Sequence, residues 1–399
     1  MTADTELLRY PLDASPGGHP PALFAKLHRE EPVSRVQLPH GGEGWLVTRY
    51  EDVRAVLTDS RFSRAAAIDR EDVARVPPRP ASRTILSMDP PEHTRLRRLL
   101  AGAFSSGRVR NMRPRIESIV ATLLSEVVAA GPGVDLVQAF AFPLPVIVIS
   151  EILGVPHQDR HRLFEFSAAM ASTTPDSREK VAAASAGLAT YLAQQIAQRR
   201  TNPTDDLLGA LVAARDNEDR LSEPELINLI IVLLLAGHET TAGSITNFVY
   251  LLLTSAGQWT YLCDHPELVP GAVEELLRFS QLNAGNLFPH IATEDVVLSG
   301  TRIRAGDAVF ADTQAANIDE SVFSDPNALD LNRKHNPHIT FGHGVHHCVG
   351  ASLARTELQV ALTAMLQHFP DLHLAVPVDE IPWKAGMVVR GPMALPIAW

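Results

Sequence analysis

Apolar residues recur with helical spacing through most of the middle of the chain. This pattern predicts a helix that opens at residues 89–93, where two prolines precede an acidic first turn, and further helices over residues 112–130, 180–200 and 268–279. The longest predicted helix runs from residue 222 to about residue 254 and is apolar on nearly all sides. Such a helix is expected to be buried at the centre of a fold.

Strand patterns are shorter and weaker than the helical ones. Residues 44–48 and 296–298 are predicted strands, residues 301–310 a hairpin turning at 305–307, and residues 387–392 a strand and turn. Prolines are dense over residues 11–39, which predicts an irregular N-terminal segment, and over 76–80, which cannot be helical. The pattern indicates a mainly α chain with small β sheets (α+β), folded as one large domain over residues 1–399.

Composition restricts the class of protein. The chain has 399 residues, 45% hydrophobic and 20% charged, with a net charge of −11, which is typical of a globular enzyme and argues against broad nucleic-acid binding. The acidic N-terminus lacks the apolar core of a signal peptide. The most apolar run, residues 226–237, contains Asn228 and stops at His238 and Glu239, which is short of membrane-spanning length. We therefore expect a cytoplasmic protein without a membrane segment.

One of the two cysteines lies in a glycine-rich loop. Residues 341–350 read Phe-Gly-His-Gly-Val-His-His-Cys-Val-Gly, and a helix is predicted to begin just after Cys348. A helix N-terminus stabilises a thiolate, which is what haem iron requires as a proximal ligand. Two alternatives remain on the loop alone: a buried structural cysteine, or a zinc site that uses His343, His346 and His347, although no second ligand cluster is apparent.

The loop resembles the haem-binding signature of the bacterial cytochrome P-450 monooxygenases, Phe-Gly-x-Gly-x-His-x-Cys-x-Gly, at all six fixed positions. The resemblance implies the cytochrome P-450 fold and haem b as the cofactor. It implies that Cys348 is the metal ligand and that His346 contacts a haem propionate. The cofactor-binding positions of the loop are then Phe341, Gly342, His346, Cys348 and Gly350.

Glu275 and Arg278 lie three residues apart on a predicted helix. Such pairs are common on solvated faces, but in the family a Glu-x-x-Arg pair is buried and closed by a later arginine, for which Arg333 stands in the matching place. We interpret these three residues as structural.

The longest predicted helix contains Ala-Gly-His-Glu-Thr-Thr at residues 236–241. Gly237 inside a helix predicts a kink beside a ligand, and an acid next to a hydroxyl suits proton delivery. Alternatively, these residues form a polar patch where the helix leaves the core. The resemblance makes Glu239 and Thr240 the catalytic acid–alcohol pair of oxygen activation.

His93 and Arg97 lie four residues apart, so one helix face offers two donors to an anion. The resemblance assigns both to the haem propionates. At residue 290 the family usually has another propionate-binding arginine, but this chain has His290, which predicts weaker or pH-sensitive haem binding.

The resemblance also places a hydrophobic substrate. Its contacts are expected from residues that are mostly apolar: Ser82, Ile85, Leu86, Met88, Ile231, Leu234, Leu235, Ala236, Asn286, Leu287, Phe288, Met387 and Val388. Family analogy favours oxygen insertion, by hydroxylation or epoxidation, into a secondary metabolite such as a macrolide, terpenoid or peptide.

No flavin or iron–sulfur motif is apparent in the sequence, so electrons are expected from another protein. The resemblance implies that an acidic ferredoxin and its reductase supply them. The arginines Arg108, Arg110, Arg113 and Arg115 could form a docking patch or an ordinary solvated face. Two other readings remain: a peroxide-driven peroxygenase, which in the family typically lacks the acid–alcohol pair, and a non-catalytic haem protein that recruits a partner.

Overall fold

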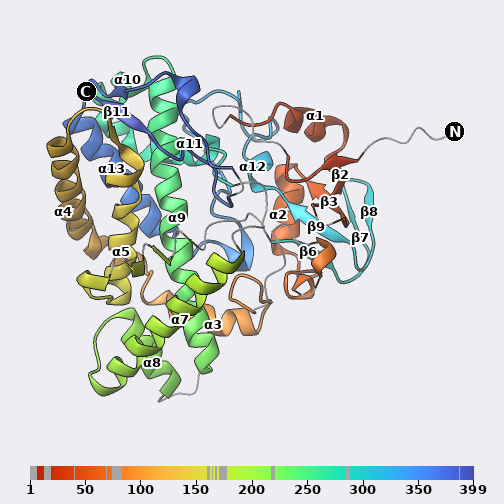
Figure 1. The fold of residues 1–399 in the computed structure, drawn as a ribbon. Coiled ribbons are helices and arrows are strands. Elements are labelled where there is room, and N and C mark those ends of the chain that lie inside the picture. The colour runs from red at the N-terminus through yellow and green to blue at the C-terminus, as the bar shows by residue number, and fades with distance from the viewer. Residues whose placement is uncertain are drawn as a thin grey trace. The chain divides into compact units, whose positions relative to one another are not determined.

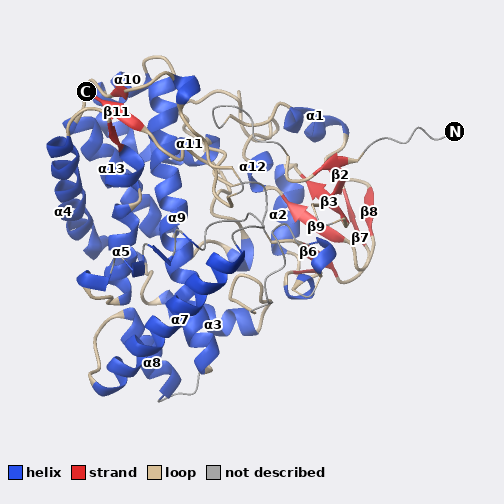
Figure 2. Cartoon of the chain, in the orientation of Figure 1, coloured by secondary structure: helices blue, strands red, loops and turns tan. Residues whose placement is uncertain are grey.

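The computed structural model describes residues 7–12, 19–39, 41–68, 70–73, 83–159, 162–163, 165–166, 169, 178–216, 221–283, 288–385 and 387–399. The chain forms two compact units (Figure 1). Unit 1 combines Met1–Thr94 with Glu274–Cys348, and unit 2 combines Arg95–Val273 with Val349–Trp399. Strands and short helices make up unit 1, whereas long helices dominate unit 2 (Figure 2). The predicted mainly α chain with small sheets is confirmed, and the prediction of one domain over residues 1–399 stays a prediction.

Unit 1 is built around a six-stranded sheet of order β1-β2-β3-β9-β6-β4 and a two-stranded sheet of β7 and β8. Its strands are β1 (Leu8–Arg9), β2 (Val33–Gln37), β3 (Glu43–Val47), β4 (Phe62–Ser63), β6 (His290–Ala292), β7 (Val296–Leu298), β8 (Thr301–Ile303) and β9 (Ala308–Ala311). Its helices are α1 (Leu23–Glu30), α2 (Tyr50–Thr58) and α12 (Thr313–Ala316), together with parts of α3 (Glu92–Ala101) and α11 (Val269–Phe279).

The short strands β4 and β6 position two residues of the candidate site. They pair antiparallel, with Phe62 opposite Ala292 and Ser63 opposite Ile291. Arg64 directly follows β4 and has helical backbone angles, φ −78° and ψ −34°, at the start of the turn Ala65–Ala67, whereas His290 is the first residue of β6. The end of β4 lies beside the start of β6, which brings the Arg64 side chain to the His290 ring.

Unit 2 consists of packed helices and one small sheet of order β10-β11-β5. Its main helices are α4 (Ser106–Ala130), α5 (Pro143–Leu153), α7 (Arg178–Thr201), α8 (Leu207–Asp216), α9 (Glu223–Thr254), α10 (Gln258–Asp264) and α13 (Ala351–His368), and its strands are β5 (Val134–Asp135), β10 (His373–Leu374) and β11 (Pro396–Ala398).

Helix α9 is the longest helix among the described residues and matches its predicted limits. Ser222 accepts a hydrogen bond from the backbone N–H of Glu225, whose side chain accepts one from the backbone N–H of Ser222. This capping box explains why the helix starts here. By length and composition alone α9 could cross a membrane, but it packs against α5, α7, α8, α10 and α13, as the core helix of a globular unit does.

Three predictions of local structure are wrong. Residues 301–310 do not form a hairpin, because β8 pairs with β7 whereas β9 pairs with β3 and β6 of the other sheet. The proline-rich segment 11–39 is not irregular throughout, since α1 and β2 lie within it and its prolines fall outside these two elements. Residues 387–392 form no regular strand, and Pro392 makes only an isolated bridge to Trp383. The segment 76–80 lies outside the described residues.

Gly237 does not interrupt α9, which continues from Glu223 to Thr254. Its glycine has a packing reason: a Cβ built there would lie 3.1 Å from Cγ1 and 3.2 Å from Cδ1 of Ile149 on α5. The absence of a side chain therefore allows α5 and α9 to approach each other closely.

Candidate functional site

The cysteine loop is a tightly hydrogen-bonded turn at the end of unit 1. The Cys348 backbone N–H donates to the Phe341 carbonyl at 2.8 Å, which closes the loop. Gly342 and Gly344 have φ values of +74° and +69°, in the region that favours glycine. At Gly344 a Cβ would also lie 2.3 Å from the carbonyl oxygen of Leu57, so this glycine lets the loop rest on α2.

The loop presents its thiol outward. The Cys348 side chain is exposed and forms no disulfide, and a Cβ at Gly342 would meet only the His346 carbonyl oxygen, at 3.7 Å. An exposed cysteine beside a face that lacks side-chain bulk fits an iron–thiolate bond to a flat macrocycle. The residues present therefore fit haem, with Cys348 as the group that would hold the iron.

Unit 1 gathers nitrogen-bearing side chains in a row formed by His93, His346, His290 and Arg64. The rings of His93 and His346 lie 4.3 Å apart between centroids, and Arg64 Nε donates to His290 Nε2 at 3.2 Å. His346 is close enough to His290 to influence its pKa. We call these four residues the nitrogen-donor row. N–H donors without a carboxylate among them suit the propionate groups of haem.

The two members joined by a hydrogen bond, Arg64 and His290, have different charge states at neutral pH. Burial, and next the charge of Arg64, hold the pKa of His290 well below 6.5. Burial also lowers the pKa of Arg64, to about 10, although Asp89 opposes the shift. His290 is therefore neutral and Arg64 is cationic near pH 7. The prediction of weaker or pH-sensitive haem binding stays a prediction.

Arg97 lies one helical turn beyond His93 on α3 and is partly buried. The boundary between the two units passes between Thr94 and Arg95, so His93 belongs to unit 1 and Arg97 to unit 2. Gly350, the last residue of the signature, lies in unit 2 and precedes α13.

The predicted acid–alcohol pair lies in the middle of α9. Glu239 is largely buried and accepts a hydrogen bond from Lys384 Nζ at 3.0 Å, while His238 Nε2 lies 4.0 Å from its carboxylate. Burial lowers the pKa of His238, whose Nδ1 donates to the Leu234 carbonyl at 2.6 Å. Lys384 is therefore the cationic partner of Glu239.

The hydroxyl next to Glu239 is held by its own helix. Thr240 Oγ1 donates to the Ala236 carbonyl at 2.8 Å, and Thr241 Oγ1 makes the equivalent bond to Gly237 at 3.4 Å. The proton of Thr240 is thus directed along the helix, and its oxygen lone pairs can accept a further hydrogen bond.

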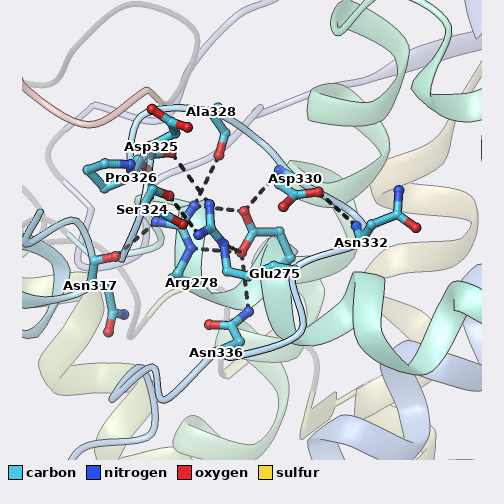
Figure 3. A network of polar contacts seen from close by, with 11 residues as sticks. Glu275, Arg278, Asn317, Ser324, Asp325, Pro326, Ala328, Asp330, Asn332 and Asn336 are labelled. Atoms are coloured by element: carbon cyan, nitrogen blue, oxygen red, sulfur yellow. Dashed lines mark hydrogen bonds and ion pairs between the residues drawn. The ribbon is translucent and has the colours of Figure 1, made fainter. Parts of the chain in front are cut away.

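The structure brings Glu275, Arg278 and Arg333 together in one buried network. Figure 3 shows Glu275 and Arg278 within it. Arg278 donates two 2.7 Å bonds to the Glu275 carboxylate, and Arg333 Nε donates a third at 2.9 Å. The remaining Arg278 donors reach the carbonyls of Asn317, Pro326 and Ala328. Every charge has partners, which is the condition under which a buried ion pair is tolerated.

The predicted substrate contacts are distributed over both units. Ser82, Asn286 and Leu287 lie outside the described residues. Unit 1 holds Ile85, Leu86, Met88 and Phe288, and the ring of Phe288 lies 5.2 Å from the Arg64 guanidinium carbon. In unit 2, Leu234 is buried to 2% exposure, whereas Ala236 is exposed; the unit also holds Ile231, Leu235, Met387 and Val388.

Sequence reasoning missed Arg64 and Lys384, and neither residue belongs to a recognisable motif. Arg64 directly follows the two-residue strand Phe62–Ser63, whose sequence gives no sign of a site. In the described part of the chain, no cluster of three or more His, Cys, Asp or Glu side chains could hold a metal ion.

Comparison with known proteins identifies the family. The cytochrome P450 family profile matches residues 142–256 and 264–392. Nocardicin C N-oxygenase of Nocardia uniformis subsp. tsuyamanensis is 54% identical over 96% of this chain and 98% of its own length. Mycinamicin IV hydroxylase/epoxidase of Micromonospora griseorubida is 49% identical over 94% of each chain.

Solved structures are similar to this chain along nearly its whole length. The LnmA cytochrome P450 hydroxylase from the leinamycin biosynthetic pathway of Streptomyces atroolivaceus S-140 superposes with a TM-score of 0.91 at 49% identity, covering 98% of this chain and all of that one. The crystal structure of HinD with NMFT and NO gives a TM-score of 0.93 at 48% identity, covering 98% of this chain and 99% of that one. With an intact cysteine loop and relatives of this similarity along nearly its whole length, the chain belongs to the cytochrome P450 family and is a monooxygenase.

Proposed function

We propose that this monooxygenase inserts one oxygen atom of O₂ into a largely apolar secondary metabolite of the macrolide or peptide class, by hydroxylation or epoxidation. The observation that carries the proposal is the closed loop that presents the exposed Cys348 thiol. The named activities of the two relatives, an N-oxygenase for nocardicin C and a hydroxylase/epoxidase for mycinamicin IV, support oxygen insertion into an organic substrate. The cofactor is haem b, and the enzyme works in the cytoplasm.

The haem, bound through the Cys348 thiolate, supplies the chemistry that activates O₂. The described residues supply its setting. The nitrogen-donor row offers N–H groups to the propionates, and the network around Glu275 fixes the segment that leads to the loop.

Glu239 and Thr240 deliver protons to the reaction. Glu239, kept close to Lys384, can take up a proton from solvent and return it, and Thr240 offers its oxygen as the next acceptor. Electrons come from a ferredoxin and its reductase. Arg108 and Arg110 of α4 are exposed and form no ion pair with a described residue, whereas Arg113 pairs with Glu117 and Arg115 with Glu151.

The first test is the visible spectrum of the purified, reduced protein under carbon monoxide. Thiolate ligation predicts a strongly red-shifted Soret band, and a band typical of histidine or thiol ligation in folded protein would contradict the proposal. Turnover with surrogate ferredoxin and reductase then separates an enzyme from a non-catalytic haem protein.

The Thr240→Ala variant tests the proton pathway in the same assay. We expect it to consume reductant but to release peroxide instead of product, because the hydroxyl acceptor is lost. Fully coupled turnover by this variant would remove Thr240 from the pathway, and product formation from peroxide alone would favour the peroxygenase alternative.

A further inference from the structure

The hydrogen-bond partners of the Arg64 guanidinium are neutral groups. Its Nε donates to the neutral His290 ring, and Nη1 donates to the Leu86 carbonyl at 3.2 Å. It forms no ion pair with any described residue. A poorly solvated cation is costly unless an anion or several good acceptors compensate it.

Asp89 is the carboxylate that acts on Arg64, but its hydrogen bonds go elsewhere. It accepts from the hydroxyl of Ser63 and from the backbone N–H groups of Arg64 and Ala65, the latter two at 3.0 and 3.3 Å. Asp89 therefore fixes the backbone that follows β4. Bonds of this kind orient the arginine side chain without using the donors of its guanidinium.

The residue at position 290 indicates why a cation is needed next to it. The resemblance to the family leads us to expect an arginine at this position, where the chain has His290, which burial keeps neutral. Arg64 directly follows β4, and its Nε reaches Nε2 of His290, the first residue of β6, at 3.2 Å. A cation at the end of β4 therefore stands beside the place where β6 lacks one.

We propose that Arg64 binds a haem propionate in place of the arginine that is absent from position 290. The inference rests on haem binding by the proposed enzyme. Arg64 supplies the charge and a planar pair of N–H donors, which match a carboxylate. His290 accepts from Arg64 Nε and so positions the guanidinium, and the Phe288 ring stacks against it.

The test measures haem retention in four variants of the full-length protein. Arg64→Ala removes the donor, and the double variant Arg64→Ala/His290→Arg returns a guanidinium to the opposite strand. Arg61→Ala is the matched control, because Arg61 lies three residues away and pairs with Asp59 on the exposed side. Arg64→Lys keeps the charge but not the planar fork. Haem transfer to an excess of apomyoglobin gives the dissociation rate.

We expect Arg64→Ala to lose haem about 10-fold faster than the wild type, as is common when a supporting contact of a metal centre is removed. Arg64→Lys should lose haem at a rate between those of the wild type and Arg64→Ala. The double variant should recover most of the haem retention, and Arg61→Ala should release haem at the wild-type rate. The midpoint potential of Arg64→Ala should shift to more negative values, because loss of a nearby positive charge favours the oxidised iron.

Three results would overturn the inference. The first is wild-type retention and potential in Arg64→Ala. The second is failure of His290→Arg to rescue haem retention. The third is a loss of stability in the haem-free variant without faster haem release, which assigns Arg64 a structural role. If Arg64→Ala does not fold, wild-type haem retention in Arg64→Lys would overturn the inference instead. Failure of the proposed function itself would show separately, as a wild-type protein without a thiolate spectrum.

Discussion

Glu357 on α13 is a buried acid that the proposed reaction does not use. Its side chain is 2% exposed, and its Oε2 has no hydrogen-bond partner among the described residues. Burial raises its pKa from 4.5 to about 8. The folded protein therefore holds a proton here that the unfolded chain releases as the pH rises above about 4.5.

The pH dependence of stability follows from this shift. Because the folded pKa is raised, the free energy of unfolding should fall as the pH increases from about 5 to 8, by up to about 1.4 kcal/mol per pH unit. Glu357→Gln should remove this fall and be more stable than the wild type at pH 8. Denaturant unfolding at both pH values measures the difference, with the exposed Glu126→Gln as control. Parallel curves for wild type and Glu357→Gln would contradict the assignment.

Some site residues were predicted from the sequence and others were missed. The two groups differ in how far along the sequence their partners lie. Cys348 and its glycines stand within one ten-residue motif, and Glu275 and Arg278 are one helical turn apart. Arg64, in contrast, meets a residue 226 positions away, and Lys384 meets Glu239 across 145 positions. Only the folded chain brings such pairs together, so no local pattern could indicate them.

At the scale of elements, the close approach of α5 and α9 depends on Gly237. Gly237→Val would place methyl groups against Ile149, and overpacking of this kind costs about 1–3 kcal/mol. That cost exceeds the gain in helix propensity, which is at most about 1 kcal/mol. We expect a lower thermal unfolding temperature for Gly237→Val and partial recovery in Gly237→Val/Ile149→Ala. A variant as stable as the wild type would show that the two helices can separate freely.

The limits of α9 were predictable because residues close to each limit determine it. A capping box marks the start, and the end of the apolar run marks the other limit. The pairing of the strands in residues 301–310 was not predictable. Alternation of apolar and polar residues indicates that a strand exists, but it does not indicate which other strand it pairs with. β8 and β9 are adjacent in sequence, yet the Ala305-Gly306-Asp307 turn leads from one sheet to another. That choice depends on β3 and β6, which lie outside the segment itself.

At the scale of the whole molecule, charge is distributed unevenly. The chain has a net charge of −11, but α4 exposes two arginines without described ion-pair partners, Arg108 and Arg110. An acidic ferredoxin would be attracted to this helix in spite of the overall charge. Arg108→Glu/Arg110→Glu should raise the KM for such a ferredoxin about 10-fold at low salt, with little change in kcat.

The difference should fade as ionic strength rises, because screening removes attraction between exposed charges. Arg108→Lys/Arg110→Lys keeps the charge and serves as the control. Equal KM values for the acidic variant and the wild type at low salt would place the docking surface elsewhere.

The contact between Arg64 and His290 has a consequence for how relatives are compared. Two residues far apart in the sequence occupy one neighbourhood in space, so a guanidinium at either position could reach the same place. A sequence alignment compares one position at a time. It would therefore show such an exchange as the loss of an arginine at one position and an unrelated gain at another. Family members that lack arginine at the position of residue 290 should therefore carry it at the position of residue 64 more often than other members do.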